Sequence, residues 1–266
     1  MKTVVVTGST RGIGRGLAEG FLKRGCRVEI SGRSQTTVDQ VVAELAASFG
    51  SDKVAGKACD IASIDDVQAL WGHAKSTFGK VDIWINNAGI TIATKPIYES
   101  DARDLQNIVN TNLLGMLLTN KVAMAGMKQQ GAGQIWNMEG FGSNGMVRLG
   151  MGPYGATKRA VNYLNKSLRK DAAGTGVQVC TLSPGMVITD LLIGEYDLQS
   201  PEWQKTKKIF NILADKVETV TPWLVDGVLA SHKDGAKVEW LTTPKVIGRF
   251  LSAGFKKRDL FEGMDV

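Results

Sequence analysis

Short apolar runs, rich in β-branched residues, alternate along this chain with longer stretches in which apolar residues recur every three or four positions. The runs predict buried strands, and the stretches between them predict helices that bury one face. Ile13, Leu17 and Phe21, for example, are spaced four apart and would line one side of a helix. The predicted strands cover residues 4–6, 27–30, 53–59, 81–85, 134–138 and 177–182.

This alternation determines the predicted fold class. Strands separated by helices are typical of βαβ units, whose right-handed crossovers produce a parallel sheet with helices on both faces. We therefore predict an α/β fold, a Rossmann-type doubly wound parallel sheet, with ligands at the carboxyl ends of the strands. Residues 100–130 are predicted to form two helices with little break between them.

The pattern changes in the last third of the chain. Residues 186–235 are predicted to be largely helical, and residues 237–241 have some strand character. No repeat, low-complexity tract or Pro/Ser-rich linker interrupts the chain, so we predict a single domain over residues 1–266. Within it, residues 1–185 would form the dinucleotide-binding core, and residues 186–266 a mostly helical substrate lid with the C-terminal segment.

Composition excludes several classes of protein. With 266 residues, 43% of them hydrophobic, the chain is long and apolar enough for a buried core, which rules out disorder. Three cysteines and two histidines are too few for a disulfide framework, a zinc site or Ser-His-Asp catalysis, and we predict no metal. The net charge of +6 comes from scattered basic residues, so nucleic acid is not an expected partner.

The N-terminus and the length of the apolar runs bear on location. The N-terminus leads directly into a predicted strand, so we expect neither a signal peptide nor a transit peptide. No apolar run approaches the roughly 18 residues that span a bilayer, so we expect no transmembrane segment. These features predict a bacterial cytoplasmic protein or a mature plastid protein, in a reducing compartment.

A glycine-rich segment, Thr7-Gly-Ser-Thr-Arg-Gly-Ile-Gly14, joins the first predicted strand to the first predicted helix. Its three glycines permit a tight turn and a close backbone approach to a phosphate. The open N-terminus of the following helix would present N–H groups to that anion. Because strand, turn and helix occur in the required order, the segment predicts a dinucleotide-binding site.

The end of the second predicted strand indicates which dinucleotide binds. An NAD site has a carboxylate there for the ribose 2′-hydroxyl, whereas this chain has Gly32 followed by Arg33. Arg11 of the glycine-rich segment can approach the same place, and two guanidinium groups suit a 2′-phosphate. Glu29 is expected to point toward a face of the sheet instead. The sequence therefore favours NADPH, with a solvated surface charge as the alternative role of Arg33.

Several further motifs follow strands or lie on helices in a fixed order. They are Asp60-Ile61, Asn86-Asn-Ala-Gly89, Asn112, Tyr154-Gly-Ala-Thr-Lys158 and Pro184-Gly185 with Thr189. Together with the T-G-x3-G-x-G spacing of the glycine-rich segment, they resemble the motifs of the short-chain dehydrogenase/reductase family over residues 3–190. The resemblance implies an oxidoreductase that binds a nicotinamide dinucleotide, here NADPH.

The resemblance assigns expected roles to these positions. The Tyr154 hydroxyl would donate a proton to a carbonyl oxygen, Lys158 would hold the cofactor ribose, and Asn112 would support a water relay. Tyr154 and Lys158 are four apart and share a helix face, so the ammonium is expected to lower the pKa of the tyrosine. The expected cofactor-binding residues are Gly8, Ser9, Thr10, Arg11, Gly12, Ile13, Gly14, Arg33, Asp60, Ile61, Asn87, Ala88, Gly89, Tyr154, Lys158, Pro184, Gly185, Val187 and Thr189.

The catalytic serine of the family is displaced in this chain. The family usually places it thirteen residues before the tyrosine, where this chain has Phe141, and Glu139 and Gly140 stand where a pair of serines is usual. Ser143 could reach the carbonyl oxygen if the glycine-rich segment 140–145 bulges, so we predict Ser143 as the second catalytic hydrogen-bond donor. The competing interpretation is a degenerate member that binds NADPH without catalysis.

Four blocks of sequence resemble one group within that family, the chlorophyll b reductases. They are residues 135–145, 154–159, 182–192 and 208–215, and they depart from the wider family in the same way as that group does. The resemblance implies NADPH-dependent reduction of the 7-formyl group of chlorophyll b or chlorophyllide b to 7-hydroxymethyl. Reduction of another bulky apolar aldehyde or ketone is the alternative.

A tetrapyrrole or another bulky apolar carbonyl compound needs a wide apolar cleft, which methionine and aromatic side chains suit. The expected substrate residues are Phe141, Met146, Met151, Leu191 and Leu192. The resemblance also implies a homodimer or homotetramer. The tail, residues 246–261, mixes apolar and basic residues, which fits peripheral attachment to an anionic membrane or docking on a partner subunit.

Overall fold

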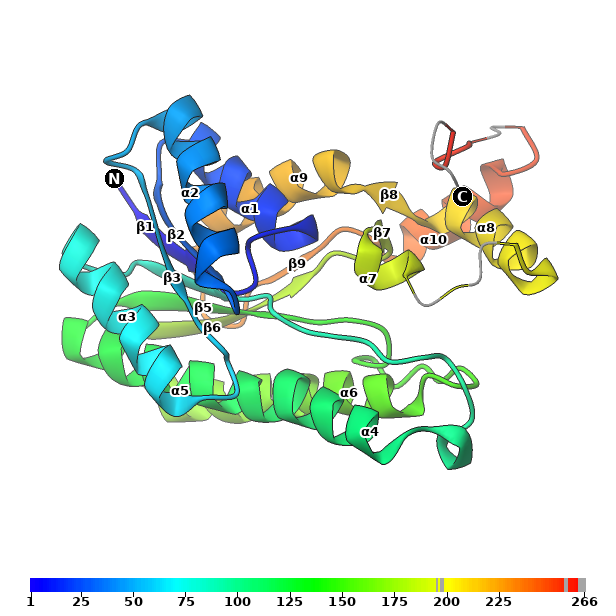
Figure 1. The fold of residues 1–266 in the computed structure, drawn as a ribbon, viewed down its shortest axis with the longest axis horizontal. Helices are drawn as coiled ribbons and strands as arrows, with labels where there is room; N and C mark the ends of the chain where they lie inside the picture. Colours follow the sequence, from blue (N-terminus) through cyan, green and yellow to red (C-terminus); the bar gives the residue numbers. More distant parts are fainter. Residues whose placement is uncertain (195, 197–198, 256–257, 263–266) are drawn as a thin grey trace.

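A seven-stranded, fully parallel sheet forms the centre of the molecule (Figure 1). The structure, a computed structural model, describes residues 1–194, 196, 199–255 and 258–262. In spatial order the strands are β3 (Val54–Ala58), β2 (Arg27–Gly32), β1 (Thr3–Val6), β4 (Ile83–Asn86), β5 (Gly133–Met138), β6 (Val177–Ser183) and β9 (Lys237–Glu239). The order reverses between β1 and β4, as in the Rossmann fold, so the predicted fold class is confirmed.

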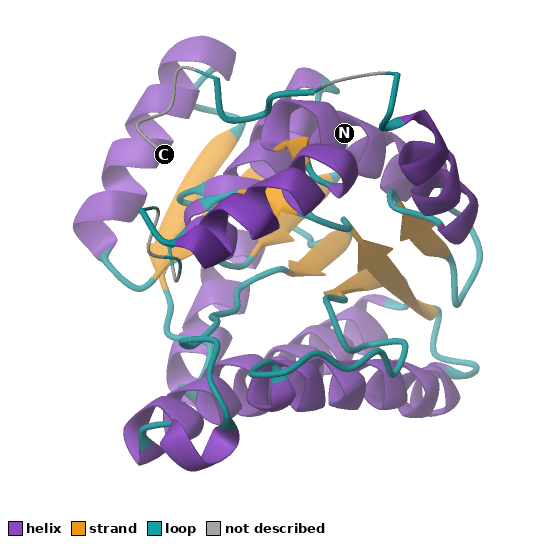
Figure 2. Ribbon diagram, turned by 90° about the vertical axis from the view of Figure 1, so that its right-hand side faces the viewer, coloured by secondary structure: helices purple, strands orange, loops and turns teal. Residues whose placement is uncertain are grey.

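Helices cover both faces of this sheet, as Figures 1 and 2 show. One face carries α1 (Gly12–Lys23), α2 (Gln35–Phe49) and α9 (Val217–Ala230), and the other carries α3 (Ile64–Phe78), α5 (Gly115–Gln130) and α6 (Gly152–Ala172). Side chains alternate along β1: Val4 and Val6 enter the first hydrophobic core, whereas Val5 enters the second. Burial on both faces explains why the central strands β1 and β4 are almost continuously apolar.

The predicted helical region 100–130 is continuous. Helix α4 (Ala102–Val109) passes through one π-helical turn, η2 (Asn110–Leu114), into α5, and a short 3-10 turn, η1 (Ile97–Glu99), precedes α4. The prediction of two helices with little break is therefore confirmed. The π-helical turn contains Asn112, and such turns often occur at functional sites.

The region after β6 departs from the prediction in one respect. It contains the predicted helices, α7 (Asp190–Ile193), α8 (Pro201–Leu213) and α9, and the later α10 (Thr243–Ser252). It also contains two strands of two residues, β7 (Val187–Ile188) and β8 (Asp215–Lys216), which pair in parallel as a second sheet. Two residues carry no periodic signal, so the sequence pattern missed them. The strand character of residues 237–241 is confirmed, because β9 extends the main sheet beside β6.

A third, smaller core lies under α8, at the end of the molecule where Figure 1 shows α8 and α10. It consists of the buried side chains of Ile188, Trp203, Phe210, Ala214 and Phe261. In the described part of the chain, every helix is too short or too polar to cross a membrane.

Candidate functional site

A cleft of about 1090 Å³ lies at the carboxyl ends of the strands. The segments that follow β1 to β6 form one side of it, and α7 and α8, which we call the lid, form the other. The sequence-predicted residues that line it are Gly8, Thr10, Arg11, Gly12, Ile13, Gly14, Arg33, Asp60, Ile61, Asn87, Ala88, Gly89, Phe141, Met151, Tyr154, Lys158, Pro184, Gly185, Val187, Thr189, Leu191 and Leu192. Four others, Ser9, Asn112, Ser143 and Met146, lie outside its lining.

The glycine-rich segment forms a close-packed turn over the N-terminus of α1. Gly8 has a φ of +63°, and a Cβ added to it would lie 2.9 Å from the Cα of Ala88. The Asn87 side-chain amide donates to the backbone oxygens of Thr7 and Gly8, at 2.9 and 3.1 Å. No side chain caps α1, so its first N–H groups face the cleft without a side-chain partner. This cradle fits the pyrophosphate of a dinucleotide.

Ser9 has a different place from the one predicted. Its side chain is buried, donates to the backbone oxygen of Val6 at 2.7 Å and accepts from the backbone N–H of Ser31 at 2.9 Å. The hydroxyl therefore ties the glycine-rich segment to β2. Its prediction as a residue in contact with the cofactor was wrong as far as the side chain is concerned.

Arg33, the first residue after β2, and Arg11 of the glycine-rich segment both lie in the cleft lining. Arg33 is exposed and, within the described residues, forms no ion pair, whereas Arg11 is 3.3 Å from Asp190 in an exposed pair. Gly32 is confined, because a Cβ there would lie 2.8 Å from Thr10 Cγ2. A guanidinium group in place of a carboxylate directly after β2 suits a phosphate better than a ribose hydroxyl.

Glu29 points away from this place, as predicted. It is fully buried in β2, and its Oε1 lies 2.7 Å from Nδ1 of His73 on α3. Burial raises the pKa of Glu29 to about 8 and lowers the pKa of His73. Near pH 7 the Glu29 carboxyl is therefore protonated and the His73 imidazole is neutral, so the pair carries no net charge. No local pattern indicates this pair, because Glu29 and His73 lie 44 positions apart.

Tyr154 and Lys158 occupy the first turns of α6 beside the end of β5. The Lys158 ammonium donates to the backbone oxygen of Met138 at 3.2 Å and lies 5.8 Å from the centre of the Tyr154 ring. Burial lowers the pKa of Lys158 to about 8, with Glu139 acting in the opposite direction. Burial raises the pKa of Tyr154 to about 12, so the predicted lowering was wrong. Desolvation of the phenolate is the larger effect, and the tyrosine keeps its proton.

Gly140, rather than Phe141, lies against the hydroxyl group of Tyr154. A Cβ added to Gly140 would be 2.5 Å from the Tyr154 hydroxyl oxygen. Ser143 lies behind this wall: it is 4% exposed, and its Oγ accepts the backbone N–H of Gly140 at 3.1 Å. The segment does bulge, with φ of +92° at Gly142, but the bulge turns the Ser143 hydroxyl onto the backbone. The structure does not bring Ser143 into the cleft as a carbonyl donor.

Asn112 holds the segment after β4. It is buried, its Oδ1 accepts the N–H of Ile90 at 2.8 Å, and its Nδ2 donates to the Ile90 oxygen at 2.8 Å. The same amide nitrogen is 3.4 Å from Thr157 Oγ1 on α6. The side chain therefore fixes the cleft wall at Ile90 and does not line the cleft itself.

The lid side of the cleft is mostly apolar. Of the predicted substrate residues, Leu191 and Leu192 line this side, Phe141 and Met151 line the cleft from the segment after β5, and Met146 is 61% exposed outside the lining. The other residues that line the cleft near the lid are Met186, Ile188, Tyr196, Thr206, Ile209 and Phe210. Arg148 and Thr94 add polar groups on the opposite rim. The apolar residues that follow Thr189 in the sequence, Tyr196 and Phe210 among them, are the signal that indicates this wall.

Comparison with known proteins gives one family. The sequence profile of the short chain dehydrogenases matches residues 2–197. A probable chlorophyll(ide) b reductase NYC1 of Oryza sativa subsp. japonica is 35% identical over 98% of this chain and 54% of the relative. A chlorophyll(ide) b reductase NOL of the same organism is 39% identical over 94% of this chain and 74% of the relative. The chain thus spans about half the length of the first relative.

Solved structures give the same fold. An alcohol dehydrogenase from Thermococcus sibiricus, complexed with 5-hydroxy-NADP, superposes with a TM-score of 0.77 at 21% identity, covering 91% of this chain and 97% of that one. A 3-ketoacyl-(acyl-carrier-protein) reductase from Brucella melitensis, complexed with NADH, has a TM-score of 0.76 at 26% identity, covering 90% and 96%. The predicted resemblance to the chlorophyll b reductases is confirmed by the relatives.

Proposed function

The chain belongs to the short-chain dehydrogenase/reductase family, and from this premise we propose that it reduces the 7-formyl group of chlorophyll b or chlorophyllide b to 7-hydroxymethyl with NADPH. Family membership makes it an oxidoreductase that uses a nicotinamide cofactor. The observation that carries the finer proposal is the Tyr154 hydroxyl in the wall of a wide, apolar cleft, in a chain whose relatives carry the name chlorophyll(ide) b reductase.

The residues of the cleft fit NADPH. The uncapped N-terminus of α1 would hold its pyrophosphate, and Arg33 with Arg11 would hold the 2′-phosphate. The segment from Pro184 to Thr189 would hold the nicotinamide end, because it lies in the cleft lining across from Tyr154 and Lys158. When bound, the cofactor supplies the hydride for the formyl carbon.

Tyr154 supplies the proton in this proposal. A phenol with a pKa near 12 is protonated throughout the neutral range, which is the form that carbonyl reduction needs. As the formyl carbon accepts the hydride, the Tyr154 O–H bond breaks and its proton passes to the formyl oxygen, which becomes the hydroxyl of the product. The Lys158 ammonium stabilises the phenolate left behind, and its pKa near 8 keeps it mostly charged at pH 7.

Ser143 and Asn112 act indirectly in this scheme. The Ser143 hydroxyl fixes the N–H of Gly140, whose Cα packs beside the Tyr154 hydroxyl. Asn112 fixes Ile90 through two hydrogen bonds. Both side chains therefore position the walls around the reacting carbonyl, and Tyr154 is the side chain that touches it.

The shape of the cleft supports a flat, bulky substrate. Its volume of about 1090 Å³ is at the upper end of small-molecule sites, which is the room that a dinucleotide and a ring system need together. Aromatic and aliphatic side chains of the lid, among them Phe210 and Leu192, provide apolar contact area. Few polar groups there would compete with the macrocycle for hydrogen bonds.

A non-catalytic NADPH-binding protein is the second candidate. The observation that favours it is the absence of a side chain at Gly140 together with the place of Ser143 outside the cleft lining. A carbonyl oxygen at Tyr154 would then receive one hydrogen bond where the family provides two. Turnover of any aldehyde or ketone that is lost in Tyr154→Phe excludes this candidate.

We also infer a self-associating face on α4, α5 and α6. Val109, Leu114, Leu117 and Tyr163 are exposed there, at 39 to 76%. The short-chain dehydrogenases commonly assemble into oligomers, and such a patch is typical of a contact between copies. Sedimentation of the wild type should give a dimer or tetramer, and Leu117→Glu should give a monomer.

A lipid surface is the partner we propose for α10. Ile247, Phe250, Leu251 and Phe255 are exposed at 51 to 93%, and no described residue of this helix is buried. An apolar stripe of this kind beside basic residues suits a membrane interface, where a lipophilic pigment resides. Binding to anionic vesicles that is lost in Phe250→Ser supports this, and equal binding of both proteins contradicts it.

The experiment that tests the proposed reaction is incubation of the purified protein with NADPH and chlorophyllide b, followed by chlorophyll b. The expected product is the 7-hydroxymethyl pigment, identified by mass and absorption. Turnover of an apolar aldehyde panel without turnover of either pigment would assign the enzyme to another bulky carbonyl substrate.

A further inference from the structure

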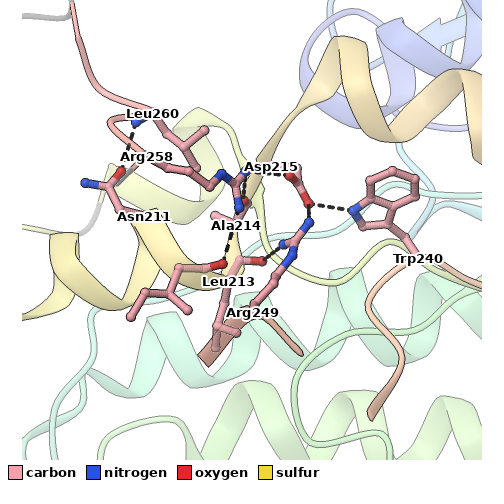
Figure 3. Close-up of polar contacts among 9 residues, drawn as sticks. Asn211, Leu213, Ala214, Asp215, Trp240, Arg249, Arg258 and Leu260 are labelled. Carbon is pink, nitrogen blue, oxygen red and sulfur yellow. Dashed lines mark hydrogen bonds and ion pairs between the residues drawn. The ribbon is translucent and has the colours of Figure 1, made fainter. Parts of the chain in front are cut away.

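A single carboxylate, that of Asp215, binds three side chains of the C-terminal region, which lie 25 to 43 positions further along the chain (Figure 3). Its Oδ2 accepts the indole N–H of Trp240 and an N–H of Arg249, both at 2.6 Å. Its Oδ1 accepts an N–H of Arg258 at 2.7 Å. Asp215, Trp240, Arg249 and Arg258 are called the Asp215 cluster below.

The two arginines of the cluster also bind the C-terminal end of α8. Arg249 donates to the backbone oxygen of Leu213 at 2.7 Å. Arg258 donates to the oxygens of Ile212 and Ala214, at 3.3 and 2.9 Å. These are the last carbonyl groups of the helix, which have no partner within it, and they carry the negative end of the helix dipole. Figure 3 shows both guanidinium groups between these carbonyls and Asp215.

Asp215 is connected to the cleft through the backbone. Strand β8 pairs with β7, so Asp215 stands opposite Val187, and its N–H donates to the oxygen of Met186 at 3.0 Å. Both Met186 and Val187 line the cleft. On the other side of the cluster, Trp240 donates its backbone N–H to Ser183 at 2.9 Å, and Leu241 packs against Gly185, where a Cβ would collide with it.

Helix α8 forms the second connection to the cleft. Thr206, Ile209 and Phe210 of this helix line the lid wall, two to eight residues before the carbonyls that the arginines bind. The C-terminal segment also reaches α8 through Phe261, which is buried against Trp203 with ring centres 5.4 Å apart. The last described turn of the chain is therefore part of the support of the cleft wall.

Ionic contacts rather than apolar burial hold α10 in place. None of its described residues is buried, whereas Arg249 is 16% exposed and Asp215 is 6% exposed. Burial would raise the pKa of Asp215, but the hydrogen bonds from Trp240, Arg249 and Arg258 outweigh it and keep the pKa below its usual value. Charge-assisted hydrogen bonds of this kind are directional, so they fix a position more narrowly than apolar contact does.

We propose that Asp215 is a positioning residue for the cleft: through Arg249 and Arg258 it transmits the position of the C-terminal segment to β7 and α8, and thereby sets the affinity for cofactor and substrate. None of the three side chains lines the cleft. The kinetic part of this proposal rests on the proposed reductase function, whereas its binding and exchange parts do not.

The variants to compare are Arg258→Gln and Arg258→Lys in the full-length chain. Arg258 is 33% exposed, so its replacement leaves the fold intact more readily than replacement of Asp215. The matched control is Arg169→Gln, which removes another Arg–Asp pair, with Asp234 at 2.8 Å, away from the lid. If Arg258→Gln does not fold, Arg258→Lys replaces it in the comparison. Lysine keeps the positive charge but lacks the planar set of N–H donors of the guanidinium group.

Three readouts are expected to change in Arg258→Gln and to stay at wild-type values in Arg169→Gln. KM for the carbonyl substrate rises about tenfold while kcat stays within about threefold. The Kd for NADPH, measured by fluorescence, also rises. Amide hydrogen exchange becomes faster in α8 and β7 and is unchanged in β1 and β4. Arg258→Lys recovers part of each change.

The proposal is overturned if Arg258→Gln and Arg169→Gln give the same KM, the same Kd for NADPH and the same exchange in α8. It is also overturned if exchange rises equally in every element, because a purely structural role predicts that result. A wild type that reduces neither pigment would contradict the proposed reaction, while the NADPH affinity and the exchange of α8 would still decide this inference.

Discussion

The two ends of the cleft are held together in different ways. The cofactor side, residues 1–189, is positioned by backbone: parallel ladders carry the strands, and at Gly8 the glycine-rich segment meets Ala88 so closely that a Cβ would be 2.9 Å from its Cα. The lid side is positioned by side chains. There the elements are held in position by the hydrogen bonds of the Asp215 cluster and by the buried rings of Trp203, Phe210 and Phe261.

This difference explains why the two sides carry different information. A backbone scaffold tolerates many sequences as long as a few glycines and polar residues remain, so the cofactor side identifies the family and the chemistry. Side-chain contacts depend on each residue present, so the lid side is where one family member differs from another in substrate. The family profile ends at residue 197, close to this division.

The largest effect expected is on the cofactor side. Tyr154→Phe removes the proton donor and leaves the fold and the NADPH site unchanged, so kcat/KM should fall by about a thousandfold. Steady-state rates of pigment reduction measure it, with NADPH fluorescence as the control for binding. A wild-type rate in Tyr154→Phe would mean that another group donates the proton, and that the cofactor side does not carry the catalytic acid.

The next effect tests whether backbone contact sets the reacting centre. Gly140→Ala adds a methyl carbon that would lie only 2.5 Å from the Tyr154 hydroxyl oxygen, so the hydroxyl must move. Displacement of that hydroxyl should lower kcat by about a hundredfold. Gly72→Ala is the matched control, because its Cβ would meet nothing within 4 Å on a helix, and it should leave kcat unchanged. Equal rates in both variants would show that Gly140 does not confine the tyrosine.

A smaller effect is expected for cofactor choice. Arg33→Asp should reverse the preference for NADPH over NADH, changing the ratio of their kcat/KM values by about thirtyfold, because a carboxylate repels the 2′-phosphate and accepts a ribose hydroxyl. Arg33→Gln removes the charge without adding the carboxylate and should weaken NADPH alone. An unchanged ratio in Arg33→Asp would mean that Arg33 is a surface charge.

The smallest effect distinguishes the two sides by the sign of their pH dependence. Glu29 has a pKa near 8 in the folded protein against 4.5 when exposed, so it holds a proton in the folded state that the unfolded chain loses. His73 offsets this effect below about pH 6.5, because its pKa is lowered in the folded protein and the unfolded chain binds the additional proton there. The free energy of unfolding should therefore fall as pH rises from about 6.5 to about 8, by more than about 1 kcal/mol. Asp215 has a lowered pKa, so its contribution is lost only as pH falls below its usual range.

Urea unfolding between pH 5 and pH 8 measures this dependence. Glu29→Gln should flatten the decline with rising pH, because glutamine carries no titrating proton. The same slope in Glu29→Gln and the wild type would assign the decline to other groups.

Much of the cofactor side could be predicted from the sequence. Short continuous apolar runs and helices with apolar residues every three or four positions determine the sheet. The role of the glycines at 8, 12 and 14 follows from their local spacing alone. The order of the strands follows from short right-handed connections. For this reason most of the predicted cofactor residues lie in the cleft lining, with Ser9 as the exception that turns inward.

The remainder depends on contacts between residues that are far apart. The place of Ser143 depends on how the 140–145 segment bulges, and the pKa of Tyr154 depends on burial by the surrounding protein, which no local pattern shows. Asp215 meets Arg249 and Arg258 across 34 and 43 positions. No spacing in the sequence pairs them, because tertiary packing alone brings α10 back to the end of α8.

Incubation of the wild type and of Tyr154→Phe with chlorophyllide b and NADPH, with the product identified by mass, is the decisive test of the proposed reaction. We expect the wild type to form a 7-hydroxymethyl pigment, heavier than the substrate by one hydride and one proton, and Tyr154→Phe to form almost none at equal NADPH binding. Unchanged pigment from the wild type, with NADPH bound, would contradict it.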